Sequence, residues 1–329
     1  MLPRRPLGSS GIEVSLLGLG GNVFGAPRLD LARSRAVIDA ASDLGVDLVD
    51  TANIYADGES EEILGEMLEG RRDRWVVATK FNLKQLGDGD LRTHVRTQLE
   101  ASLRRLRSDY VDVYQLHLAP PDSVDPLELL TVLDSLVREG SVRAVGVCNA
   151  ASWRLARYDG LSREHGLVRL ATVQDYWHLL ARGVESEVVP YVSRAGIGVL
   201  PYHPLGGGYL TGKYRPGAER PAGTRGAAGS PIIETMDSPQ TYAAVQALTA
   251  IAGDHGRSVG ELAIAYLASQ PVVSSVIAGA STPEQLQQNA AGAAWQLDAA
   301  TLAAIDAAVP RPADPEVLPY TGRQPGAAR

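Results

Sequence analysis

The sequence predicts an α/β protein folded as a (β/α)8 TIM barrel, and two observations carry that prediction. Short runs rich in β-branched residues alternate with longer segments of helical periodicity along almost the whole chain. The short runs are also apolar on both faces, which is typical of parallel strands covered on both sides. A doubly wound open sheet shows the same alternation and stays open as an alternative. The eight predicted strands are residues 14–19, 46–50, 75–79, 111–116, 142–147, 170–174, 198–202 and 274–278.

Helical segments are predicted between the strands. The first is followed by Gly45, a residue type that commonly terminates helices. Two of them lie between the seventh and eighth strands, and one more follows the eighth unit, so the barrel carries extra helices. The predicted helices are residues 31–44, 61–68, 91–106, 126–138, 153–165, 186–195, 240–255, 259–269, 283–291 and 299–308.

We assign residues 1–309 to one barrel domain, because closed α/β barrels often use this much chain as a single unit. Residues 203–238 are rich in Gly, Pro, Ala and Thr and are predicted to form a long loop at the C-terminal rim. Residues 310–329 contain five prolines and are predicted to form a C-terminal tail.

Composition excludes several classes of protein. The 329 residues carry 38 acidic and 31 basic side chains, a net charge of −7 that argues against nucleic-acid binding. No stretch approaches the roughly 20 apolar residues of a membrane helix, and no secretory signal begins the chain. The single cysteine, Cys148, cannot form a disulfide within the chain, which fits a reducing compartment, so we expect a cytoplasmic protein. The six histidines form no H-E-x-x-H pair or Cys/His cluster, so no metal site is predicted.

Four polar residues follow the predicted strands at the rim where barrels carry their chemistry. Asp50 ends the second strand and Tyr55 comes shortly after it, while Lys80 and His117 follow the third and fourth strands. A tyrosine titrates near pH ~10, and a neighbouring ammonium is expected to lower that pKa. Asp50 would hold the lysine in place, and His117 would hydrogen-bond the reacting oxygen. The set suits protonation of a carbonyl oxygen as a hydride arrives, or the reverse.

Each residue also has a structural interpretation: a turn cap, a loop aromatic, a solvated charge and a satisfied interior imidazole. The motifs around the four residues resemble those of the aldo-keto reductase superfamily, in order and over nearly the whole chain. Residues 7–20 resemble the family's N-terminal hairpin and first strand, and residues 50–61 its second signature. Residues 78–80 and 114–117 resemble the third and fourth. The resemblance implies that Tyr55 is the general acid–base, that Lys80 and Asp50 tune it, and that His117 positions the carbonyl.

A hydride donor is needed, since no side chain supplies one, and the resemblance implies a nicotinamide cofactor. Residues 18–23 nearly fit the G-x-G-x-x-G fingerprint, but Val23 occupies the last glycine position. Binding is therefore expected at the barrel rim. The matching rim positions are Cys148 and Asn149 after the fifth strand and Gln174 at the end of the sixth. Where the family often has Tyr-Asn, this chain has Trp and His at 177–178.

The seventh strand leads into a second group of cofactor candidates. Tyr202 matches the aromatic residue that stacks on the nicotinamide ring in relatives. Glycines at 206–208 would let backbone N–H groups approach the pyrophosphate. The other candidates in this segment are His203, Pro204, Leu205, Gly207 and Lys213.

The eighth strand is followed by a predicted helix start. Thr282 suits the N-cap position and Gln285 would complete a capping box, and a helix N-terminus is a ready anion site. No basic residue lies between 279 and 289, where many NADP-preferring relatives have one. Hydroxyls here, with Lys213 or Arg215, would have to bind a 2′-phosphate. We favour NADP and leave NAD open. The cofactor candidates in this segment are Gly279, Ser281, Gln285 and Asn289.

The expected function is interconversion of a small carbonyl compound and its alcohol with NADP(H). Val23, Phe24, Phe81 and Leu118 are the candidates for the substrate pocket. A cofactor-binding regulatory protein, similar to the potassium-channel subunits of the same family, stays open as the alternative. A barrel isomerase acting on phosphorylated sugars would leave Lys80 and Asp50 unexplained. Assembly into a homo-oligomer is also left open.

Overall fold

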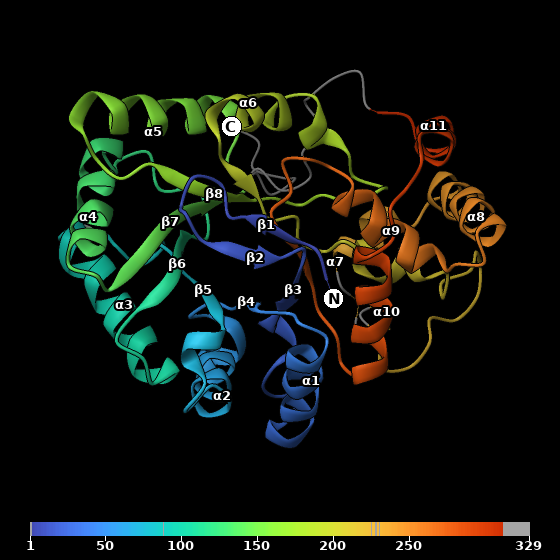
Figure 1. Ribbon diagram of the computed structural model, residues 1–329, viewed down its shortest axis with the longest axis horizontal. Helices are drawn as coiled ribbons and strands as arrows, with labels where there is room; N and C mark the ends of the chain where they lie inside the picture. Colours follow the sequence, from blue (N-terminus) through green and yellow to red (C-terminus); the bar gives the residue numbers. More distant parts are fainter. Residues whose placement is uncertain (1, 88, 225, 228, 230, 312–329) are drawn as a thin grey trace.

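The computed structural model describes residues 2–311, apart from positions 88, 225, 228 and 230, and its centre is a parallel eight-stranded sheet (Figure 1). Backbone hydrogen bonds from Val199 N to Val272 O (2.8 Å) and from Ile277 N to Pro201 O (2.9 Å) join the two edges. The sheet is therefore closed, and the predicted barrel is confirmed. In sheet order the strands are β10 (Val276–Ala278), β3 (Leu17–Gly20), β4 (Leu48–Asp50), β5 (Val76–Phe81), β6 (Val111–Leu116), β7 (Val142–Cys148), β8 (Leu170–Gln174) and β9 (Gly198–Val199).

Helices surround the barrel (Figure 1). Many of them begin at a side chain that accepts a hydrogen bond from the first turn, such as Asp30, Asp90 and Asp125. The helices are α1 (Leu31–Asp43), α2 (Glu59–Met67), α3 (Leu91–Leu106), α4 (Pro126–Arg138), α5 (Ser152–His165), α6 (Val188–Ala195), α7 (Pro231–Met236), α8 (Pro239–Asp254), α9 (Val259–Ala268), α10 (Pro283–Ala293) and α11 (Ala299–Ala308).

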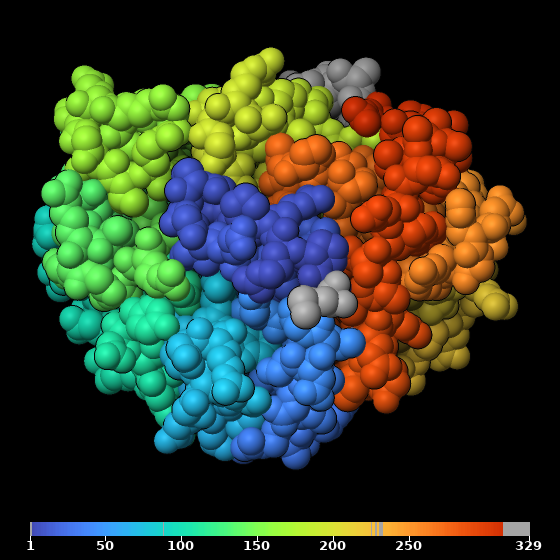
Figure 2. Space-filling model, in the orientation of Figure 1, coloured from blue at the N-terminus to red at the C-terminus, as the bar shows by residue number. Residues whose placement is uncertain are grey.

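An N-terminal hairpin covers one end of the barrel. β1 (Arg4–Pro6) pairs antiparallel with β2 (Glu13–Ser15), and Figure 2 shows this part of the chain across the centre of one face. Apolar hairpin side chains such as Leu7 pack into the cluster that fills the barrel interior. Gly8 has a φ of 55°, and a Cβ atom there would lie 2.0 Å from Ala171 O, so only glycine fits. The hairpin closes this end of the barrel, and the carboxyl ends of the strands lie at the opposite end.

The predicted first strand, residues 14–19, is wrong in one respect. The hairpin ladder ends where Ser15 pairs with Arg4, and the barrel ladder begins where Leu17 pairs with Val276. The Ser15 hydroxyl donates to Leu17 O at 2.7 Å across the intervening bend. The predicted strand therefore belongs partly to the hairpin and partly to the barrel. Its mostly apolar sequence does not mark the bend.

Other boundaries shift by a few residues. β9 is shorter than predicted, since Pro201 has no N–H group to donate to the ladder. The segment 203–238 contains a 3-10 helix, η5 (Gly206–Thr211), and the short helix α7, as well as irregular chain. Of the predicted tail 310–329, residues 312–329 lie outside the described residues. Across the described part of the chain, no helix combines the length and apolar character needed to cross a membrane.

Candidate active site

Lys80 and Asp50 form an ion pair inside the barrel. Lys80 Nζ lies 2.6 Å from Asp50 Oδ2 and also donates to Thr51 O at 2.8 Å. Lys80 is 0% exposed and Asp50 3%, so neither charge is shared with bulk water. Burial alone would lower the pKa of Lys80, but the charges of Asp50 and Tyr55 raise it above its ordinary value. The lysine is therefore held as an ammonium ion.

Tyr55 lies in a tight turn next to this pair. The turn is the 3-10 segment η2 (Tyr55–Gly58), in which Ala56, Asp57 and Gly58 all have positive φ angles of 47°, 54° and 100°. The hydroxyl of Tyr55 lies 3.5 Å from Lys80 Nζ. Left-handed non-glycine residues cost free energy and concentrate at functional sites. The fold thus holds this phenol in place through a strained turn.

The pKa of Tyr55 is raised, so the prediction that the ammonium of Lys80 would lower it below its ordinary value is wrong. Burial raises this pKa more than the Lys80 ammonium lowers it, and the charge of Asp50 also raises it. The sequence predicted the lysine but could not give the degree of desolvation around the ring. Tyr55 is consequently a phenol, and a proton donor, throughout the neutral pH range.

His117 completes the group on the other side of Tyr55. It follows β6, and its ring meets the Tyr55 ring edge to face at 5.7 Å between centroids. Burial, with the positive charges of Lys80 and Lys84, lowers the pKa of His117 to about 3. Its Nδ1 atom is buried and has no hydrogen-bond partner among the described residues. The structure thus brings all four predicted polar residues together, with a neutral imidazole among them.

Gln115 is a site residue that the sequence analysis missed. Its Nε2 atom donates to Asp50 Oδ1 at 3.3 Å, and Gln174 Nε2 donates to the same oxygen at 2.8 Å. The two amides leave Asp50 fully hydrogen-bonded, which a buried carboxylate requires. A buried polar residue near the carboxyl end of a barrel strand was the signal that could have revealed Gln115.

The strand-end candidates for the cofactor lie around the same opening. Cys148 Sγ lies 4.0 Å from Gln174 Oε1, and burial raises the pKa of this thiol, so it is no ready nucleophile. The Tyr202 hydroxyl donates to Asn149 Oδ1 at 2.8 Å. Asn149 and His203 both have positive φ angles, 54° and 55°. Two further strained residues therefore lie among the cofactor candidates.

The chain after β9 turns sharply through glycines. Gly206, Gly207 and Gly208 have φ angles of 52°, 63° and 110°. Lys213 folds back against this turn, since a Cβ atom at Gly208 would lie 2.9 Å from its Nζ. Pro204 and Leu205 lie between Tyr202 and the turn. The N–H groups of Gly206 and Gly208 already donate to His203 O and Leu205 O, at 2.8 and 2.9 Å. The ammonium of Lys213 is therefore the group at this turn that suits a phosphate.

The start of α10 holds the last group of candidates. Thr282 caps the helix, but Gln285 Oε1 accepts from Ser281 N at 2.8 Å and not from Thr282, so the predicted capping box is wrong. Gly279 lies against Val23. Asn289 is 6% exposed, and its Nδ2 atom has no hydrogen-bond partner within the described chain. This buried donor without a partner fits the predicted place of Asn289 in the cofactor site.

The substrate candidates are not equivalent. Val23, 6% exposed, ends the 3-10 segment η1 (Gly21–Val23), and Leu118 is half-buried beside His117. Phe24 and Phe81 are 1% and 0% exposed and offer almost no surface to a ligand. The Phe81 ring stacks on Tyr114 at 4.6 Å between centroids. Alternation along β5 places Phe81 on the opposite face from Lys80.

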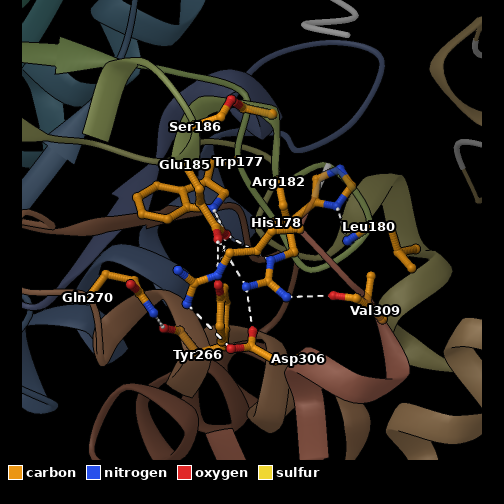
Figure 3. A network of polar contacts seen from close by, with 12 residues as sticks. Trp177, His178, Leu180, Arg182, Glu185, Ser186, Tyr266, Gln270, Asp306 and Val309 are labelled. Atoms are coloured by element: carbon orange, nitrogen blue, oxygen red, sulfur yellow. Dashed lines mark hydrogen bonds and ion pairs between the residues drawn. The ribbon is translucent and has the colours of Figure 1, made fainter. Parts of the chain in front are cut away.

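Trp177 and His178 stand where the resembled family often has Tyr-Asn. Their hydrogen bonds go to residues outside the predicted cofactor site. Trp177 Nε1 donates to Glu185 Oε1 at 2.9 Å, within a buried network in which Arg182 donates to the same oxygen and to Asp306 on α11 (Figure 3). His178 Nδ1 accepts from Leu180 N at 3.1 Å. Trp177 thus helps to fix the loop after β8 against the C-terminal helix.

Comparison with known proteins decides the family. The model of the aldo/keto reductase family matches residues 16–310. The chain belongs to the aldo/keto reductase family. Members of this family are oxidoreductases that typically depend on NAD(P)H and act on small carbonyl compounds.

Individual aldo/keto reductase relatives cover nearly the whole chain. Protein tas of Escherichia coli is 34% identical over 91% of this chain and 95% of its own length. A probable voltage-gated potassium channel subunit beta of rice is 34% identical over 86% and 88%. The aldo-keto reductase YhdN of Bacillus subtilis is 32% identical over 89% of each chain.

Proposed function

We propose that this protein reduces an aldehyde or ketone with NADPH, and oxidises the corresponding alcohol in reverse, with Tyr55 as the general acid–base. The observation that carries the proposal is the position of the Lys80 ammonium. Its Nζ atom lies 2.6 Å from Asp50 Oδ2 and 3.5 Å from the Tyr55 hydroxyl. An acyl-transfer site would need an activated nucleophile, and the buried thiol of Cys148 has a raised pKa.

The residues present fit a nicotinamide dinucleotide. The amide donor of Asn289, and the ammonium of Lys213 beside the glycine turn at 206–208, offer polar partners for its adenosine and phosphate groups. Tyr202 and Asn149, already hydrogen-bonded to each other, would lie against the nicotinamide end together with Gln174. NADP is proposed over NAD, with Ser281 and Lys213 as partners for the 2′-phosphate. When bound, the cofactor supplies the hydride that no side chain can provide.

The chain's own residues handle the proton. The Tyr55 hydroxyl donates its proton to the carbonyl oxygen as negative charge develops there. Lys80 stabilises the phenolate that remains, and Asp50 keeps the lysine charged and fixed. Neutral His117 hydrogen-bonds the substrate oxygen and holds it near the phenol. Burial of the ion pair strengthens these electrostatic effects by excluding water.

Steady-state oxidation of NADPH with a panel of aldehydes and ketones tests the proposal, with NADH measured in parallel. We expect turnover on at least one carbonyl compound and a lower KM for NADPH than for NADH.

A second function has one specific observation in its favour, the 34% identity to a protein named as a potassium channel subunit beta. In that case the chain would bind NADP(H) with the same residues and turn over little. Tight cofactor binding without turnover on any member of the panel would favour this alternative over the reductase.

A further inference from the structure

Glu61, in the first turn of α2, is a buried carboxylate that the proposed chemistry does not use. The residue is 0% exposed. Its Oε1 atom accepts a hydrogen bond from the Thr79 hydroxyl. Its Oε2 atom lies 2.7 Å from both Nε and Nη2 of Arg105 on α3. One side chain thus connects α2 with β5 and with α3.

The two ends of this connection adjoin two of the four site residues. Thr79 immediately precedes Lys80 on β5. α2 begins directly after η2, the strained turn that starts at Tyr55. The carboxylate of Glu61 therefore joins the segment that carries the phenol to the strand that carries the ammonium.

Arg105 extends the connection to the turn itself. Gly58 has a φ of 100°, and a Cβ atom there would lie 2.9 Å from Arg105 Cδ and 3.0 Å from Nε. The arginine side chain therefore packs directly against the turn. A guanidinium with two of its nitrogens on one carboxylate has a defined orientation. Glu61 thereby fixes the arginine side chain against which the turn packs.

The neighbouring serine secures the other side of the helix start. Ser60 is 0% exposed, its hydroxyl donates to Gly21 O at 2.8 Å, and the Thr51 hydroxyl lies 2.8 Å from it. Thr51 follows Asp50 in the chain. The first turn of α2 is thus hydrogen-bonded to Gly21 and Thr51 through Ser60, and to Thr79 through Glu61.

We propose that Glu61 is a positioning residue that holds Tyr55 at its working distance from Lys80 through Thr79 and Arg105. The proposal rests on the proposed role of Tyr55. The separation of 3.5 Å between the hydroxyl and Nζ is already at the outer limit of a hydrogen bond, so a small shift of η2 breaks it. Misplacement by about 1 Å costs on the order of 10²-fold in rate.

The test compares Glu61→Gln with Glu62→Gln, since Glu62 lies exposed on the same helical turn and serves as the matched control. Glutamine keeps the shape of the side chain but removes the charge that orients Arg105. In Glu61→Gln we expect kcat to fall by about ten- to a hundredfold, with KM and the Kd for NADPH changed less than about threefold. Glu62→Gln should match the wild type in all three constants.

Thr79→Val is the second variant, because it removes only the contact with β5 and protects the test if Glu61→Gln folds poorly. It should lower kcat in the same way, with NADPH binding retained. Wild-type kcat in both Glu61→Gln and Thr79→Val overturns the proposal. A parallel loss of kcat and of NADPH binding capacity also overturns it, since that result indicates a structural role alone.

Hydrogen–deuterium exchange separates this proposal from the proposed function. If the wild type turns over no carbonyl compound, the reductase proposal fails, but exchange at residues 54–58 still reports on the turn. Faster exchange there in Glu61→Gln than in Glu62→Gln supports the positioning role. Equal exchange in the two variants contradicts it.

Discussion

Lys80 directs its ammonium toward the hydroxyl of Tyr55 across 3.5 Å, from a strand position that is fully buried inside the barrel. Its position does not depend on the tyrosine, because Asp50 and Thr51 O hold the same nitrogen at 2.6 and 2.8 Å. The phenol therefore meets a charge that is already fixed before any substrate binds. Preorganised charge of this kind stabilises an anionic transition state without reorganisation during the reaction.

Lys80→Met tests this charge. We expect kcat to fall by at least about 10²-fold, because the phenolate loses its counter-charge. Urea unfolding should show a loss of about 3–5 kcal/mol, since Asp50 is left buried and unpaired. Lys84→Met, at an exposed position, is the matched control and should behave as the wild type. Retention of kcat in Lys80→Met contradicts the assigned role.

The pH dependence of reduction follows from the pKa values of His117 and Tyr55. The pKa of His117 is lowered to about 3, so the imidazole stays neutral above that pH. The pKa of Tyr55 is raised, so the phenol keeps its proton up to strongly alkaline pH. We therefore expect kcat/KM for reduction to be flat between about pH 5 and 9. An inflection near the ordinary histidine pKa that disappears in His117→Gln would contradict this prediction.

Asn289 tests the cofactor site. Its buried amide has a donor without a partner among the described residues, and a bound adenosine group would satisfy it. Asn289→Leu should weaken NADPH binding by about tenfold, measured by fluorescence titration. Gln288→Leu, at an exposed position on the same helix, should leave the Kd unchanged. Equal Kd values for the two variants would remove Asn289 from the site.

Gly8 tests the closed end of the barrel. Gly8→Ala should destabilise the protein by about 2–4 kcal/mol in urea unfolding, because the new methyl group meets Ala171 O and the backbone is left-handed. Gly11 also has a positive φ, of 75°, but a Cβ atom there would have no neighbour within 4 Å. Gly11→Ala should therefore lose only about 1 kcal/mol. Similar losses in both variants would show that the steric contact at Gly8 is unimportant.

The sequence predicted the barrel because its strands are continuous apolar runs and its helices have terminal caps, which are local properties. It also predicted the four polar residues, since each lies at or just after the carboxyl end of a strand and these ends meet at one rim. It did not predict the bend between β2 and β3, because residues 14–19 are mostly apolar and carry no proline that would separate Ser15 from Leu17.

Properties that depend on three-dimensional packing could not be predicted from the sequence either. The pKa of Tyr55 depends on how completely the fold desolvates the ring, and the sequence shows only that a lysine is near. Gln285 accepts from Ser281 N and not from Thr282 N, a choice that the spacing of a capping box in the sequence does not reveal. The role of Glu61 depends on its contacts with Thr79 and Arg105, which are distant from it in the sequence.

The most direct test of the central claim is single-turnover reduction of a good carbonyl substrate by Tyr55→Phe with NADPH already bound. The variant loses one hydroxyl and keeps the ring that packs against His117. We expect the rate of hydride transfer to fall by about 10²–10⁴-fold while the Kd for NADPH stays within about twofold of the wild type. A wild-type rate in Tyr55→Phe, with the cofactor bound, would show that this phenol is not the proton donor.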